Sequence, residues 1–167
     1  MESNWTTLRP YHDVSYIKIQ QYKCTDPGLI LCLQYIVYYT CQNCSTTESS
    51  AKAGLVERFS INFMSRSDFE SDVIFHMINQ YDKNQIAFNA KNSGGSWENE
   101  EVYNDTGAYV AGKQFTVLIA LKDDKFMTTV NGNHIADFKV RKSTSYIKYL
   151  HIAVDINISS VEFESFT

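Results

Sequence analysis

The sequence is poor in proline and has no long uninterrupted apolar run. The first feature bears on its secondary structure, and the second on whether it can span a membrane. Only 2 of the 167 residues are proline, whereas 10 are phenylalanine and 11 are tyrosine, an aromatic content that favours β-strands. The longest apolar stretch, residues 29–39, is interrupted by Gln34 and is too short to span a bilayer. We therefore expect no membrane insertion.

Clusters of basic residues and a secretory leader are also missing. The formal net charge is -4 and no basic run occurs, so the chain lacks the electrostatic footprint of a nucleic-acid partner. Residues 1–9 are polar and no apolar segment follows them, which argues against an ordinary signal peptide. We expect a cytoplasmic protein. We interpret the four N-x-S/T sequons as chance occurrences: Asn4, Asn43, Asn104 and Asn157.

Cysteine is too sparse for a zinc site of the usual kind. Four cysteines are present, and Cys41 and Cys44 form a C-x-x-C pair. A structural zinc site needs a second such pair, and the spacing of Cys24 and Cys32 does not supply one. We interpret all four as reduced thiols and expect neither a metal nor another cofactor. Oxidation of the C-x-x-C pair stays open.

The sequence does contain many short segments in which apolar and polar residues alternate. Such segments are typical of half-buried strands, and no segment keeps a convincing helical period. Asn131-Gly132 is the strongest hairpin signal. We expect strands over residues 14–22, 29–39, 57–64, 72–81, 85–90, 96–103, 114–122, 126–130, 134–140, 147–155 and 159–165. This spacing predicts an all-β protein, an antiparallel sandwich of two sheets, with a barrel as the alternative.

The length of the chain indicates a single domain. We expect an irregular lead-in over residues 1–13 and the domain itself over residues 14–167. Residues 40–54 differ from both flanks, because they are rich in Ser, Thr, Asn and Ala and lack periodic apolar positions. A loop of this length is unusual in a compact domain, so we interpret it as an insertion between two strands.

Four side chains with sugar-binding chemistry fall in three consecutive expected strands. His76 and Asn89 each end an apolar stretch, and Trp97 and Glu100 lie together in the next segment. If these segments pair as neighbouring antiparallel strands, the four side chains converge on one face. A hexose has an apolar patch that stacks on an aromatic ring, and hydroxyls that polar side chains must match. Each residue alone is more often structural, but in this order and spacing they predict a carbohydrate site.

Residues 26–166 resemble a galectin carbohydrate-recognition domain. The matching motifs are Pro27-Gly28, Arg58-Phe59-Ser60-Ile61-Asn62-Phe63, Phe75-His76, Ile86-Ala87-Phe88-Asn89, Trp97-x-x-Glu100, Val130-Asn131-Gly132 and His134-Ile135-Ala136-Asp137-Phe138. The resemblance implies a two-sheet antiparallel jelly-roll sandwich of the galectin and concanavalin type. It also implies a metal-independent site for β-galactosides, in which Trp97 stacks on the sugar and His76, Asn89 and Glu100 bind hydroxyls. Galectins commonly leave the cell without a signal peptide, so leaderless secretion is the alternative to a cytoplasmic location.

The resemblance breaks down at the two arginines of the galectin motifs. Counted from His76, the motif asparagine falls on Ile78 and the first arginine on Gln80. The second arginine position is occupied by Val102. We include Gln80 among the expected site residues, and also Asn79, which is one residue out of register and faces the opposite surface unless a bulge re-aims it. Arginine forms bidentate charge-assisted hydrogen bonds, so its loss predicts weakened binding of plain lactose.

These residues leave two functions open and argue against a third. The first is a lectin that binds galactose-containing glycans or glycoproteins non-covalently through a partly altered site. The second is a galectin-fold protein without sugar binding that acts through protein contacts, including a homodimer formed through sheet edges. The third is a glycosidase, which needs two carboxylates facing each other across the sugar. Glu98 and Glu100 lie along one expected strand and flank nothing, so we expect no enzyme.

Overall fold

The computed structural model describes residues 15–18, 34–39, 58–80, 83–105, 107–109, 115–153 and 158–164. The expected lead-in at residues 1–13, the expected insertion at 40–54 and all four cysteines lie outside these residues. Within the part of the chain that the structure describes, no helix is long and apolar enough to cross a membrane.

The described residues form eleven strands and one short 3-10 helix, η2. The bounds are β1 Ser15–Lys18, β2 Gln34–Tyr39, β3 Arg58–Met64, β4 Val73–Gln80, β5 Gln85–Lys91, β6 Glu101–Asn104, β7 Phe115–Lys122, β8 Lys125–Val130, β9 Asn133–Lys139, η2 Thr144–Tyr146, β10 Tyr149–Ala153 and β11 Ile158–Glu164. Each strand overlaps one segment expected from the alternating pattern. No expected segment corresponds to η2, and β6 begins five residues later than expected.

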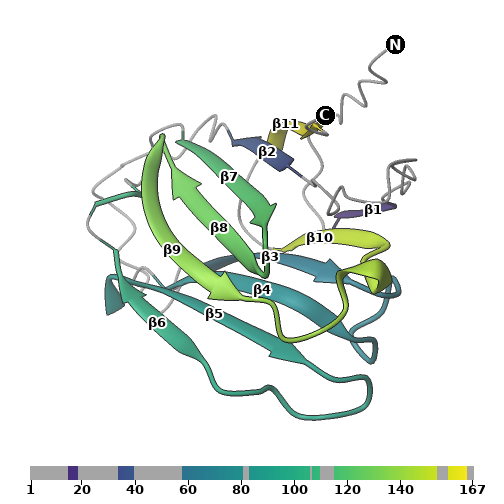
Figure 1. Cartoon of the computed structure of the whole chain (residues 1–167). Helices are drawn as coiled ribbons and strands as arrows, with labels where there is room; N and C mark the ends of the chain where they lie inside the picture. Colours follow the sequence, from purple (N-terminus) through teal and green to yellow (C-terminus); the bar gives the residue numbers. More distant parts are fainter. Residues whose placement is uncertain are drawn as a thin grey trace, which may run out of the picture.

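The strands form two sheets that face each other (Figure 1). The six-stranded sheet has the order β1-β10-β3-β4-β5-β6, and the five-stranded sheet has the order β11-β2-β7-β8-β9. Every pair of neighbouring strands is antiparallel. This arrangement confirms the two-sheet antiparallel sandwich that the sequence predicts.

The space between the sheets is filled largely by phenylalanine. Phe63 and Phe75 of the six-stranded sheet contact Phe126 of the other sheet, with ring centroids 5.8 and 4.8 Å apart. Phe88 stacks on Phe138 across the same interior at 6.1 Å. Because successive side chains of a strand point to opposite faces, burying these rings directs their neighbours outward. The core therefore determines which residues of β3, β4 and β5 reach the outer face of the six-stranded sheet.

The β8–β9 hairpin forms where the sequence predicts it. Asn131 and Gly132 have φ values of 51° and 78°, in the left-handed region. Val130 pairs with Asn133, so the turn has two residues. Two consecutive left-handed residues match the twist of the flanking strands, which is why Asn-Gly is favoured there.

Candidate functional site

A row of polar side chains crosses the outer face of the six-stranded sheet. It consists of His151, Asn62, His76 and Asn89, on β10, β3, β4 and β5 respectively. Each member lies opposite the next in the antiparallel register, so their side chains are close neighbours on one surface. The residues on either side of each member belong to the core, which turns the polar residue outward.

Asn62 joins the two histidines of this polar row. Its Oδ1 lies 2.5 Å from His76 Nδ1, and its Nδ2 lies 3.1 Å from His151 Nδ1 and 3.4 Å from the His151 carbonyl oxygen. A carbonyl oxygen can only accept, so the amide nitrogen must be the atom on the His151 side. Oδ1 then accepts from His76. This pattern assigns the proton of His76 to Nδ1 and makes Nε2 its hydrogen-bond acceptor.

Both histidines are neutral near pH 7. The pKa of His76 is lowered to about 4, chiefly because the ring is buried and secondarily because His151 would repel its charge. Burial also lowers the pKa of His151, whose ring is covered edge-on by Phe69 at a centroid distance of 4.7 Å. The polar row therefore carries no positive charge, and His76, the partly exposed histidine of the two, offers a ligand a hydrogen-bonding dipole.

Trp97 lies beside His76 with its ring partly open to solvent. The ring centroids are 4.6 Å apart, the planes are inclined by 45°, and Trp97 is 43% exposed. A single bridge pairs Trp97 with Lys91 at the end of β5. An exposed indole next to a neutral imidazole can stack on an apolar patch of a ligand while the imidazole accepts a hydrogen bond at its edge.

An extra residue separates Trp97 from β6 and explains the late start of that strand. Phe88 and Lys91 are three residues apart on β5, whereas their partners Glu101 and Trp97 are four apart. The additional residue is a β-bulge. In a regular strand Trp97 and Glu100 would face opposite sides, and the bulge lets both reach the outer face.

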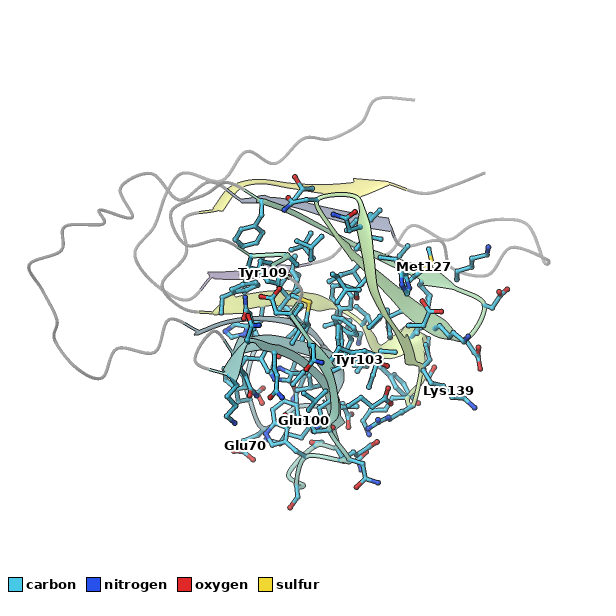
Figure 2. All side chains as sticks on the ribbon, turned by 90° about the vertical axis from the view of Figure 1, so that its left-hand side faces the viewer. Glu70, Glu100, Tyr103, Tyr109, Met127 and Lys139 are labelled. Carbon is cyan, nitrogen blue, oxygen red and sulfur yellow. The ribbon has the colours of Figure 1, made fainter. Side chains whose placement is uncertain are left out.

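Glu100 is exposed on the outer side of the six-stranded sheet (Figure 2). Tyr103 packs edge-on against Phe88 in the core, with ring centroids 5.6 Å apart, and Glu101 bonds to Arg141 on the inner side. Alternation on either side of Glu101 therefore turns Glu100 and Val102 outward. Glu100 is therefore exposed on the same face as the polar row.

The turn that precedes Trp97 is held by the loop between β3 and β4. The amide of Gly94 and the hydroxyl of Ser93 both donate to the carbonyl oxygen of Glu70 at 2.9 Å. The amide of Ser93 also donates to Asp72 Oδ1 at 2.8 Å. These bonds tie together two loops that lie where β4 begins and β5 ends, at the same end of these antiparallel strands.

Arg141 and Lys142, which follow β9, hold the Trp97 segment from its other side. Lys142 Nζ lies 2.6 Å from Glu98 Oε1. Arg141 donates to Glu101 Oε1 and to the carbonyl oxygen of Asn99, both at 2.6 Å. The two cations thus neutralise carboxylates and bind backbone on both sides of Glu100, so the segment is positioned before any ligand arrives.

Asn89 is buried, and backbone groups occupy both ends of its amide. Its Nδ2 donates to the carbonyl oxygen of Glu98 at 3.0 Å, and its Oδ1 accepts from the amide of Ala90 at 2.8 Å. Asn89 is only 5% exposed. The side chain replaces a ladder hydrogen bond lost at the bulge, so it supports the Trp97 segment.

A second row, mostly apolar, lies beside the polar row on the same face. Ile78 of β4 is opposite Ser60 of β3 and Ala87 of β5. Ala87 is in turn opposite Val102 of β6, which is 46% exposed. Gln80 lies two residues beyond Ile78 on the same face and is buried. Three expected site residues, His76, Asn89 and Trp97, therefore come together at the polar row. Glu100 is exposed on the same face, and Gln80 lies one row beyond the apolar one.

The structure does not bring Asn79 to this face. Asn79 pairs with Phe59 and Ile86, which both belong to the core, and it is fully buried. The register from His76 to Gln80 is uninterrupted on both sides, so no bulge re-aims it. The expectation that Asn79 joins the other site residues is wrong. Strand alternation turns its side chain inward.

Sequence reasoning missed four residues that organise the site: Asn62, His151, Arg141 and Lys142. Asn62 was recognisable only as a polar residue on the outward side of an alternating strand. The other three contact residues that lie 40 or more positions away in the chain, and no local pattern announces such contacts.

Acidic and histidine side chains of the described residues do not gather into a metal site. No group of three or more of them in that part of the chain is placed to hold a metal ion.

The chain is similar to galectins in both sequence and fold. The model of the galactoside-binding lectin family matches residues 39–163. The chain is 27% identical to galectin-7 of Rattus norvegicus over 106 residues, which cover 63% of this chain and 76% of that protein. It is 27% identical to galectin-4 of Homo sapiens over 109 residues, which cover 65% of this chain but 33% of that protein. A solved structure of a human galectin-16 double variant is similar in fold, with a TM-score of 0.71, 20% identity and coverage of 96% of this chain and 99% of that chain.

Proposed function

The chain belongs to the galectin family of galactoside-binding lectins, and on this basis we propose that it binds galactose-containing glycans non-covalently through a partly altered site. The observation that carries the proposal is the pairing of an exposed Trp97 with a neutral His76 at 4.6 Å on the outer face of the sheet. An indole supplies stacking surface and the imidazole supplies one directional acceptor, which together suit a sugar ring.

Each remaining site residue has a role that follows from its surroundings. Glu100 is exposed and would accept hydrogen bonds from ligand hydroxyls. Asn89 would act mainly by holding the Trp97 segment, because its amide already bonds to the Glu98 carbonyl and the Ala90 amide. Gln80 would offer a neutral amide where galectins have an arginine.

Plain lactose is expected to bind weakly. Hydrogen bonds to charged groups contribute about 1.5–3 kcal/mol each, and the chain has Gln80 and Val102 where the galectin motifs have arginines. Losing two such partners would weaken a millimolar-to-micromolar ligand by orders of magnitude. Glycans that do not depend on those contacts are therefore the better candidates.

The alternative function is a galectin-fold protein without sugar binding that acts through protein contacts. The commitment of Asn89 to backbone groups favours it, because one fewer amide is available to a sugar. The edges of the two sheets, β1 and β6 in one and β9 and β11 in the other, are where a homodimer would form.

The galectin family consists of lectins, and we propose no enzymatic activity for this chain. Glu98, one half of the carboxylate pair that a glycosidase would need, is held by Lys142 at 2.6 Å and lies 3.7 Å from Arg141. Glu98 is thus occupied by two cations of its own chain and does not face a second carboxylate across a sugar. A cytoplasmic location or export without a signal peptide stays a prediction from the resemblance.

Binding of the purified full chain to a broad glycan array tests the proposal, with Trp97→Ala and His76→Ala alongside. We expect wild type to bind a subset of galactose-containing glycans and both variants to lose at least tenfold in affinity, about 1.4 kcal/mol. His134→Ala is the matched control, because His134 is exposed on β9 of the opposite sheet. A folded wild-type protein that binds no glycan would support the alternative function instead.

A further inference from the structure

The proposed function leaves one feature of this face without a role. It is the mostly apolar row beside the polar row, formed by Ser60, Ile78, Ala87 and Val102. Two residues along a strand span about 6.6 Å, so His76 and Ile78 lie that far apart. Trp97 lies opposite Lys91, on one side of the polar row, and Ile78 and Val102 lie on the other side. A glycan that stacks on Trp97, bonds to His76 and continues in the same direction therefore reaches Ile78 and Val102. The chemical groups that make favourable contact with these two side chains therefore determine which glycan binds.

Ile78 and Val102 cannot satisfy a hydroxyl. Ile78 is partly exposed and Val102 is 46% exposed, and between them lies the buried methyl group of Ala87. A hydroxyl pressed onto this surface loses its bonds to water and gains none in return. An apolar group pressed onto the same surface removes exposed hydrocarbon from water on both sides of the contact.

Glu100 precedes Val102 by two residues and is exposed on the same face, whereas the two cations of this segment are already engaged. Arg141 is bound to Glu101 and Asn99, and Lys142 is bound to Glu98. These cations lie on the inner side of the Trp97 segment, because they follow β9 of the opposite sheet. They do not turn the apolar row into a polar one.

We propose that the glycan bound on this face presents a methyl-bearing group to Ile78 and Val102, as a 6-deoxy sugar or an N-acetylated sugar does. The proposal rests on the proposed function and names its ligand class. The two sugars share one chemistry, a methyl group where an unmodified hexose has only a hydroxyl. Selectivity arises because burying the methyl group against this row is favourable, whereas burying a hydroxyl there costs free energy.

Titration calorimetry of matched galactosides tests this inference. The ligands are one β-galactoside in three versions: unmodified, 6-deoxy, and 2-N-acetylated. Wild type should bind at least one modified version about fourfold tighter than the unmodified one, the effect of burying one methyl-sized group. Which modified version is preferred identifies the source of the methyl group.

Two variants show whether the preference comes from the apolar row. Val102→Ser and Ile78→Thr keep strand-compatible side chains but add a hydroxyl, and each should reduce the preference toward unity. Leu118→Thr is the matched control on the outer side of β7, and it should leave the preference unchanged. Melting temperatures confirm that each variant is folded.

The outcomes separate the two proposals. Equal affinity of wild type for all three versions would overturn the inference while the lectin function stands. A preference that survives in both Val102→Ser and Ile78→Thr would also overturn it, because the methyl group would then sit elsewhere. A wild-type protein that binds other glycans on the array but none of the three versions would also overturn the inference alone. A folded wild-type protein that binds no glycan at all would overturn both.

Discussion

At the scale of single residues, the site depends on how buried amides are satisfied. Asn62 bonds to both histidines of the polar row, and Asn89 bonds to two backbone groups. Asn79 is also buried, but neither its Nδ2 nor its Oδ1 has a hydrogen-bond partner. The same residue type therefore has opposite consequences for stability at neighbouring positions of one sheet.

Replacing Asn79 by leucine should stabilise the protein. The side chains are similar in size, and the change removes an unsatisfied buried amide that costs about 1–3 kcal/mol. We expect the free energy of unfolding, measured by urea denaturation, to rise by about that amount. Asn89→Leu is the matched control and should lower it, since it removes an amide whose two bonds are made. Equal effects of the two substitutions would contradict this account.

At the scale of elements, the bulged segment before β6 is positioned by two partners that come from elsewhere in the chain. The β3–β4 loop binds Ser93 and Gly94 through the backbone of Glu70. Lys142 and Arg141 bind the segment from the opposite side. Rigid support of this kind holds a stacking ring in place, which lowers the entropy lost when a ligand binds.

Substitution of Lys142 by methionine should loosen this segment without unfolding the sandwich. Lys142 is 10% exposed and bonds to Glu98 and Asn92, so the change removes two contacts while keeping most of the hydrocarbon stem. We expect faster amide hydrogen exchange over residues 93–100 and a loss of stability of about 1 kcal/mol.

Lys125→Met provides the comparison for this prediction. Lys125 forms a 3.8 Å ion pair with Asp137 in which both side chains are largely exposed. The Lys125→Met variant should leave amide hydrogen exchange over residues 93–100 unchanged. Protection at residues 93–100 that is the same in Lys142→Met and wild type would show that the β3–β4 loop alone holds the segment.

At the scale of the whole molecule, the buried histidines link folding to pH. Both His76 and His151 have a pKa lowered by burial, to about 4 for His76, whereas an unfolded chain titrates its histidines near 6.5. Below that pH the unfolded state binds more protons than the folded state. Acidification therefore favours unfolding, and the loss continues for His76 until about pH 4.

The free energy of unfolding should fall between about pH 7 and pH 5, by up to about 1.4 kcal/mol per pH unit for each histidine. Urea unfolding at several pH values measures the slope. A double variant with His76→Gln and His151→Gln should be less stable at neutral pH but should show a flatter slope over this range. A wild-type slope equal to that of the double variant would refute the linkage.

The sequence by itself determined the eleven strands, the Asn131-Gly132 hairpin and the position of the aromatic residues in the core, because alternation and turn chemistry are local properties. It also determined that Asn79 is out of step with His76, since alternation along one strand needs no partner. Only the tertiary structure decided the bulge that turns Trp97 and Glu100 to one face. The same holds for the pairing of Asn62 with His151, 89 residues away, and for the attachment of Arg141 and Lys142. Those features depend on strand register and on contacts between distant segments, which no local pattern specifies.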